Sequence, residues 1–273
     1  MYAHPHVFPS RCQSEHVAPR YWIKQYGLQR SGTNYSRALI ESLCPEARVL
    51  ASILGTKHDL PDLDAAVARL REGDVGIAKT DLATEDFQEI MRAYEMGELR
   101  ILVCVRDAVV WMDSLERYRA KRERREPQVL TRTTIEDWVR RWLDYYSQLH
   151  DWCESSTLSS SWVVHHQVVR NPEMVVEIAE NWGIPCNDEI QRLGYMRNGS
   201  DEHSSRFISR QKYRPNQYPE VYSGAGLIAL EDVRWTTDLV KSLDSRKLSR
   251  NWMWKGASLR RRTSQQLSGD RTE

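Results

Sequence analysis

The stretch Tyr26-Gly27-Leu28-Gln29-Arg30-Ser31-Gly32-Thr33-Asn34-Tyr35 lies between a predicted strand and a predicted helix. The strand covers residues 22–28, where aromatic and β-branched residues alternate with polar positions and a glycine stands near the end. The helix begins at Asn34, because apolar residues follow at helical spacing and Pro45 lies just past residue 43. A polar turn therefore connects a strand directly to a helix.

This turn has the composition of a phosphate cradle. Such a turn directs several backbone N–H groups, and the positive end of a helix dipole, toward one point. Gly32 allows the backbone to approach an anion closely, and Arg30 adds a permanent positive charge. The side chains that add neutral hydrogen-bond donors are Ser31, Thr33 and Asn34. A surface turn capped by Ser31 would have the same sequence, so the turn alone leaves both interpretations open.

Length and composition indicate one domain of ordinary proportions. A chain of 273 residues can bury a single sizeable core. We expect an irregular arm over residues 1–20 and one α/β domain over residues 21–255. Residues 256–273 are rich in Arg, Ser and Gln and are predicted to form a disordered tail.

The charge balance and the apolar runs argue against several classes of protein. Lys and Arg total 39 against 38 for Asp and Glu, so net charge favours neither a nucleic-acid partner nor a membrane surface. No apolar run is long enough to form a transmembrane segment. The N-terminus lacks the apolar centre of a signal peptide, so we expect a cytoplasmic protein. The five cysteines include no C-x-x-C pair, which predicts reduced structural thiols, no zinc site and no disulfide framework.

Strands and helices alternate along the rest of the chain. Further strands are predicted at residues 49–54, 75–78, 99–105 and 162–164. Further helices are predicted at residues 64–71, 85–98, 109–125, 134–149, 171–183 and 227–243. This alternation predicts an α/β, three-layer fold in which a central parallel sheet carries helices on both faces.

Charged residues appear where the predicted strands end. Lys79-Thr80-Asp81 follows the strand at 75–78, and Arg106-Asp107 follows the near-continuously apolar strand at 99–105. Ligands of open α/β sheets bind at the carboxyl ends of strands. Ser114 lies two helical turns beyond Arg106, so the two side chains can point at one phosphate, although a surface arginine and a solvated serine would look the same.

Taken together, four motifs resemble the sulfotransferase family, whose fold is of the P-loop type. Arg30-Ser31-Gly32-Thr33 resembles the loop that binds the 5′-phosphosulfate, and Arg106 with Ser114 has the spacing of the residues that hold the 3′-phosphate. Lys79-Thr80-Asp81 resembles the stretch that carries the catalytic base, and residues 163–185 resemble a later strand followed by an N-P-E helix and a G-I-P ending.

The resemblance implies a sulfuryl transferase that uses 3′-phosphoadenosine 5′-phosphosulfate as its donor and needs no metal. The acceptor would be a hydroxyl or amine of a small molecule or carbohydrate, in a pocket shaped by the aromatic segment 196–226. The residues implied to bind the donor are Arg30, Ser31, Gly32, Thr33, Asn34, Arg106 and Ser114. Arg210 and Lys212 are the nearest matches to the family's C-terminal loop on the 3′-phosphate.

Two residues compete for the role of general base. Asp81 stands where the family has a catalytic histidine, and the charge of Lys79, two residues earlier, would keep it ionised. His58 has an unperturbed pKa suited to the task, and Asp59 adjoins it in sequence.

Departures from the family pattern leave two other functions open. His165-His166-Gln167 replaces the usual Tyr-Glu-Asp, which together with Asp81 would fit a non-catalytic nucleotide-binding protein on the same fold. A P-loop kinase using a nucleoside triphosphate is the second alternative, although no Lys follows Gly32 as the G-K-[ST] motif requires.

Overall fold

The computed structural model describes residues 19–76, 79–187, 193–194, 201, 207–208, 227–228 and 230–244. The predicted tail and all but two residues of the predicted arm lie outside these ranges. Most of the aromatic segment 196–226 lies outside them as well, so its predicted role is not tested.

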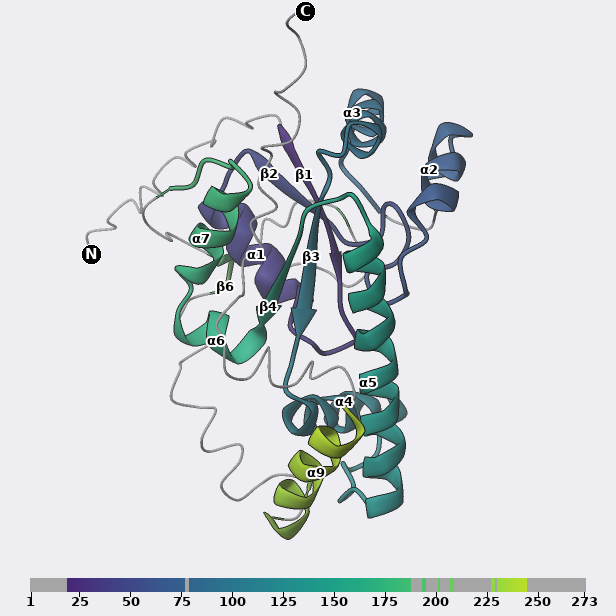
Figure 1. Cartoon of the computed structure of the whole chain (residues 1–273), viewed down its shortest axis with the longest axis vertical. Helices are drawn as coiled ribbons and strands as arrows, with labels where there is room; N and C mark the ends of the chain where they lie inside the picture. Colours follow the sequence, from purple (N-terminus) through teal and green to yellow (C-terminus); the bar gives the residue numbers. More distant parts are fainter. Residues whose placement is uncertain are drawn as a thin grey trace, which may run out of the picture.

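The centre of the molecule is a four-stranded parallel sheet with the order β2-β1-β3-β4 (Figure 1). Its strands are β1 (Tyr21–Tyr26), β2 (Ala47–Leu50), β3 (Arg100–Val105) and β4 (Ser160–Val164). Tyr26 at the end of β1 lies opposite Val103, and Val105 at the end of β3 lies opposite Val164. The segments that follow β1, β3 and β4 therefore leave the sheet at the same edge.

Helices cover both faces of this sheet. One face carries α1 (Thr33–Leu43), α6 (His165–Arg170) and α7 (Met174–Asn181). The opposite face carries α2 (Leu63–Arg71), α3 (Thr84–Glu95), α4 (Ala108–Glu123), α5 (Arg132–Ser155) and α9 (Leu230–Leu243). A short antiparallel pair, β5 (Leu193–Gly194) with β6 (Phe207–Ile208), stands apart from the sheet. The predicted α/β architecture with helices on both faces of a parallel sheet is confirmed.

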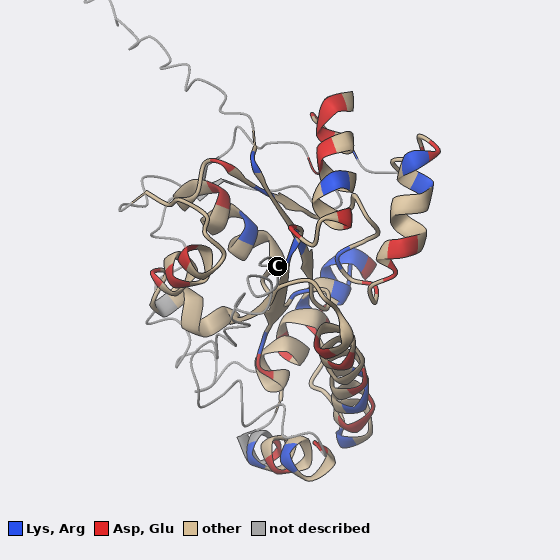
Figure 2. Cartoon of the chain, turned by 45° about the horizontal axis from the view of Figure 1, so that its top comes forward, with Lys and Arg blue, Asp and Glu red and all other residues tan. Residues whose placement is uncertain are grey.

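Strand composition explains the two hydrophobic cores. On β1, Ile23 packs toward α1, whereas Trp22 and Tyr26 pack toward the helices of the other face, as the two-residue period of a strand requires. On β3, residues 101–105 are all buried, since both faces of a central parallel strand are covered. Lys and Arg are interspersed with Asp and Glu on the helices rather than gathered on one side (Figure 2).

The prediction of a strand at residues 75–78 is wrong for the half of it that is described. Val75 and Gly76 are not in a strand, while residues 77–78 lie outside the described ranges. Gly76 has a φ of 71°, a left-handed conformation that interrupts extended backbone. The apolar run alone did not reveal this turn.

The prediction of five reduced cysteines is also wrong. Cys44, at the end of α1, forms a disulfide with Cys186, and their Cα atoms lie 4.2 Å apart although 142 residues separate them. Cys104 and Cys153 are free and buried. Only the packing of α7 beside α1 brings the bonded pair together, so sequence spacing carries no signal for it. Disulfides are typical of oxidising compartments, and the cytoplasmic location stays a prediction.

No helix in the described part of the chain is both long enough and apolar enough to span a membrane.

Candidate functional site

The turn after β1 is closely packed around two glycines. Gly32 caps α1 with a φ of 96°, and a Cβ atom built on it would lie 2.4 Å from Nδ1 of His165. A Cβ atom on Gly27 would lie 2.5 Å from the carbonyl oxygen of Cys104. Arg30 adopts a left-handed conformation with a φ of 73°. The neighbouring strands therefore hold the turn in one shape that side chains at these glycines would prevent.

The structure brings three of the predicted donor-binding side chains together. Arg30 donates from Nε to the hydroxyl of Ser114 at 3.3 Å. Arg106 donates from Nη1 to the same hydroxyl at 3.1 Å and to the carbonyl oxygen of Arg30, also at 3.1 Å. Two guanidinium groups and a hydroxyl thus meet beside the turn, although 84 residues separate Arg30 from Ser114. We call residues 27–34, Arg106 and Ser114 the turn cluster.

Neighbouring helices hold this cluster in position. Trp111 of α4 donates from Nε1 to the carbonyl oxygen of Gln29 at 2.8 Å. Trp142 of α5 donates from Nε1 to the carbonyl oxygen of Arg106 at 3.0 Å. Asp107 caps α4 by accepting from the backbone N–H of Val109 at 3.0 Å. The backbone on both sides of the cationic pair is therefore fixed before any ligand binds.

His165, which departs from the family pattern, lies in the immediate surroundings of the turn cluster. It follows β4 directly and packs against Gly32. Burial lowers the pKa of its imidazole well below the ordinary value, and the charges of Arg106, His166 and Arg30 lower it further. A position that disfavours an additional positive charge is one that favours an anion.

A buried lysine reaches the turn from the loop after β2. Lys57 donates from Nζ to the side-chain oxygen of Asn34, and its carbonyl oxygen accepts from the N–H of Gly27 at 2.8 Å. Burial lowers the pKa of Lys57 to about 8, and the charge of Arg37 contributes to the lowering. The loop therefore holds both ends of the turn, and the sequence contained no signal for this beyond a titratable side chain in a loop.

His58, in the same loop, has a defined tautomer. Its Nδ1 lies 2.7 Å from the carbonyl oxygen of Gly27. A carbonyl can only accept, so Nδ1 carries the hydrogen and Nε2 keeps a free lone pair in the neutral ring. Burial lowers the pKa of His58, while the Gly27 hydrogen bond opposes this shift. The ring is therefore neutral near pH 7, with Nε2 able to accept a proton.

Asp81 and Lys79 lie apart from the turn cluster. Asp81 forms an ion pair with Arg48 of β2. Arg48 lies opposite Trp22, four residues before the end of β1, which is about 13 Å of strand at about 3.3 Å per residue. Lys79 is exposed, and its carbonyl oxygen accepts from the N–H of Asp201 at 2.8 Å. Asp81 and Lys79, which were predicted from the resemblance to the stretch with the catalytic base, therefore contact β2 and its surroundings.

Two further buried charges fix the loop that carries Lys57 and His58. The carboxylate of Asp201 accepts from the backbone N–H groups of residues 51–53, at 2.9 Å from Ser52. Lys24 donates from Nζ to backbone carbonyls of the same loop, at 2.8 Å to Ile53. Burial lowers the pKa of Lys24 to about 7. An anion on one side and an amine on the other thus satisfy both the donors and the acceptors of this loop.

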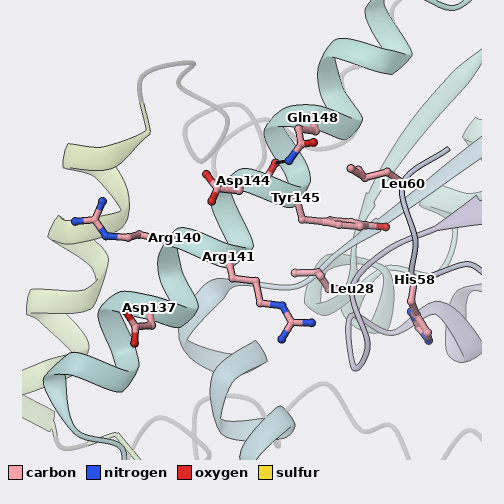
Figure 3. A pocket seen from close by; sticks show the side chains of 9 residues that line it. All are labelled: Leu28, His58, Leu60, Asp137, Arg140, Arg141, Asp144, Tyr145 and Gln148. Carbon is pink, nitrogen blue, oxygen red and sulfur yellow. Dashed lines mark hydrogen bonds between the residues drawn. The ribbon is translucent and has the colours of Figure 1, made fainter. Parts of the chain in front are cut away.

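A pocket of about 460 Å³ opens beside the turn (Figure 3). We call it the α5 pocket, because one face of α5 forms most of its wall. Its lining residues are Leu28, His58, Leu60, Asp137, Arg140, Arg141, Asp144, Tyr145 and Gln148. Leu28 belongs to the turn cluster, so the pocket and the turn share a wall.

The structure does not test two further predictions, namely the residues of the C-terminal loop and the absence of a metal. Arg210 and Lys212 lie outside the described residues. Within the described ranges, no group of three or more His, Cys, Asp or Glu side chains could hold a metal ion.

Comparison with protein-family models, curated proteins and solved structures finds no match to this chain.

Proposed function

We propose that this protein transfers a sulfuryl group from 3′-phosphoadenosine 5′-phosphosulfate to an acceptor hydroxyl or amine, on a fold of the P-loop type. The observation that carries the proposal is the meeting of Arg30, Arg106 and Ser114 at the turn between β1 and α1. The donor carries one phosphate on the 5′ position and one on the 3′ position of its ribose. The turn cluster offers backbone N–H groups for one phosphate and the side chains of Arg106 and Ser114 for the other. The motif resemblance to sulfotransferases supports the same assignment.

The turn itself would bind the 5′-phosphate. Backbone N–H groups near the start of α1 and the positive end of the helix dipole favour an anion there. Gly32 fits this use, because the turn needs its left-handed conformation and the imidazole of His165 occupies the space that a Cβ atom would need. Arg30 would stabilise the negative charge that grows on the leaving oxygen. Its guanidinium cannot give up a proton near neutral pH, so this role is electrostatic.

Arg106 and Ser114 would bind the 3′-phosphate. Arg106 offers a planar fork of donors that suits a phosphate, and Ser114 adds a hydroxyl from α4. Their mutual hydrogen bond at 3.1 Å already holds both groups at one point. The donor supplies the activated sulfuryl group, and the protein supplies position and charge.

His58 is the better-supported base. Its Nε2 lone pair is free to take the acceptor proton, because Nδ1 donates to Gly27 beside the turn. Asp81 is engaged by Arg48 at β2. The acceptor oxygen or nitrogen would bond to sulfur as the bond from sulfur to the bridging oxygen breaks. The proton would go to His58, and the electron pair of the broken bond would leave on the 5′-phosphate.

The proposal is tested by calorimetric titration with adenosine 3′,5′-bisphosphate and with adenosine 5′-monophosphate. Arg106→Ala should weaken binding of the bisphosphate by about 10- to 150-fold, the range for a hydrogen bond to a charged group. Ser114→Ala should weaken it by about two- to tenfold, since a neutral donor is worth less. Neither variant should change binding of the monophosphate as much. Arg92→Ala, an exposed arginine of α3, is the matched control.

Transfer is then followed with donor labelled in the sulfuryl group. Equal losses for both nucleotides would remove the 3′-phosphate assignment. Tighter binding of a nucleoside triphosphate than of the bisphosphate would favour a kinase, and donor binding without transfer to any acceptor would favour a non-catalytic binding protein.

A further inference from the structure

The α5 pocket lies where an acceptor would have to sit. It shares Leu28 with the turn cluster, and it is also lined by His58, whose Nδ1 is bonded to Gly27 of the same turn. A molecule in the pocket would therefore be next to both the anion-binding turn and the proton acceptor. Its volume of about 460 Å³ lies within the range of small-molecule sites, roughly 300–1,000 Å³.

One face of α5 supplies hydrogen-bonding groups of both kinds. Asp137, Arg141, Asp144 and Gln148 follow each other at intervals of three or four residues, which puts them on one side of the helix. Carboxylates only accept, guanidinium groups only donate, and an amide does both. A hydroxyl group also donates and accepts, so this wall matches a ligand with several neighbouring hydroxyls.

The apolar part of the wall is small. Leu28 and Leu60 are the two aliphatic residues in the pocket lining, and Tyr145 adds one aromatic ring. Figure 3 shows Arg141 and Tyr145 extending from α5 toward the side of the pocket that carries His58 and Leu60. A site for a steroid, a fatty chain or a polycyclic phenol would need a predominantly apolar lining. The lining here therefore disfavours such acceptors.

Arg141 has the properties of a ligand-binding side chain. It is exposed, and it forms no ion pair within the part of the chain that the structure describes. Its neighbour Arg140 is held by Glu136 at 2.6 Å and points away from His58 in Figure 3. Of these two arginines, Arg141 is the one whose donors face the turn side of the pocket.

We propose that the α5 pocket binds a hydroxyl-rich acceptor, a sugar or a similar polyol. This inference rests on the proposed sulfuryl transfer and names its substrate class. One hydroxyl of the acceptor faces His58 Nε2, and the others pair with the carboxylates, Arg141 and Gln148 along α5. In the transfer, the acceptor oxygen bonds to sulfur, its proton moves to His58, and adenosine 3′,5′-bisphosphate is the leaving product.

The test is saturation-transfer NMR from the protein to a saccharide, with adenosine 3′,5′-bisphosphate present. The probes are glucose, galactose, maltose and lactose, with 4-nitrophenol and hexylamine as the phenolic and amine alternatives. Wild-type protein should give signals from at least one saccharide and weaker signals from the other two probes. Arg141→Gln should reduce the saccharide affinity about tenfold, since a hydrogen bond to a charged group is lost. Arg69→Gln, an exposed arginine of α2, should leave it unchanged.

The same saccharides are then offered as acceptors with labelled donor. Arg141→Gln should raise the acceptor KM about tenfold while binding of the bisphosphate stays at the wild-type value. A preference for 4-nitrophenol or hexylamine, or an unchanged KM in Arg141→Gln, would overturn the inference. A wild type that binds bisphosphate but no saccharide would overturn this inference alone. A wild type that does not bind bisphosphate would overturn the proposed function.

Discussion

The turn cluster and the α5 pocket share a wall but are built in different ways. The turn cluster joins the ends of β1 and β3, and its backbone is held by Trp111, Trp142 and Lys57. The α5 pocket is formed by one helix face, the loop after β2 and Leu28 of the turn, and most of the side chains that α5 contributes are exposed. The shape of the turn cluster therefore depends on contacts that also hold the fold together. The α5 pocket consists mainly of surface side chains that can be substituted without disturbing those contacts.

This difference has a physical consequence. A change in the turn cluster disturbs part-buried hydrogen bonds and the close packing around its glycines, so it should affect stability as well as donor binding. A change on the open face of α5 removes a solvent-exposed side chain, and such changes have little effect on stability. We therefore expect variants of the turn cluster to bind the donor more weakly, and variants of the α5 face to bind only the acceptor more weakly.

The largest expected effect concerns His58, which contacts both regions. His58→Gln can keep the hydrogen bond to Gly27 but cannot act as a base, so the transfer rate should fall by about 100- to 10,000-fold. Binding of bisphosphate should change little. Because burial holds the pKa of His58 below 6.5, the neutral form predominates above that pH. The wild-type rate should therefore stay level above pH 6.5 and fall only where the pH passes below the lowered pKa of His58.

Asp81→Asn is the counterpart that sharpens this prediction. It should leave the rate near the wild-type value, because Asp81 is paired with Arg48 at β2. A large loss in Asp81→Asn, together with an active His58→Gln protein, would return the role of base to Asp81. Rates measured with labelled donor across the pH range decide between the two.

The second effect in size concerns Arg30, which belongs only to the turn cluster. Arg30→Ala should lower turnover by about 100- to 1,000-fold, the range for loss of one group that stabilises charge in a transition state. Donor affinity should fall less, since the charge on the leaving oxygen grows during the reaction. Arg30→Lys should retain part of the rate, and the acceptor KM should be unchanged in both variants. Normal turnover by Arg30→Ala would show that Arg30 does not stabilise the transition state, and it would contradict the role of the turn in catalysis.

The smallest expected effect is a difference in unfolding free energy between alanine substitutions at two glycines with similar backbone conformations. Gly32 has a φ of 96° and contacts His165, whereas Gly73 has a φ of 84° and has open space around its Cα. Alanine at either position should cost about 1–3 kcal/mol of backbone strain. Gly32→Ala should lose about 1–3 kcal/mol more, because its Cβ would overlap the imidazole. Urea unfolding measures both, and equal losses would show that His165 can move aside without cost.

Local patterns were enough to predict the central unit of the fold. The strand and helix that flank the turn were predicted within two residues, and so was the buried strand that precedes Arg106. Each of these elements is formed by contiguous residues whose apolar spacing predicts a single type of secondary structure. The strand expected at residues 75–78 is absent at its described half, residues 75–76, where Gly76 adopts a left-handed conformation.

The sequence by itself determined the parallel α/β layering, because strands and helices alternate along the chain. It also determined the pairing of Arg106 with Ser114, which depends on a short spacing within one strand and helix. Only the tertiary structure decided that Arg30 joins them, that His165 packs on Gly32, and that Cys44 meets Cys186. It also set the tautomer of His58, because Nδ1 lies beside a carbonyl oxygen 31 residues away. Contacts of this kind arise from strand order and register, and no local pattern in the chain encodes them.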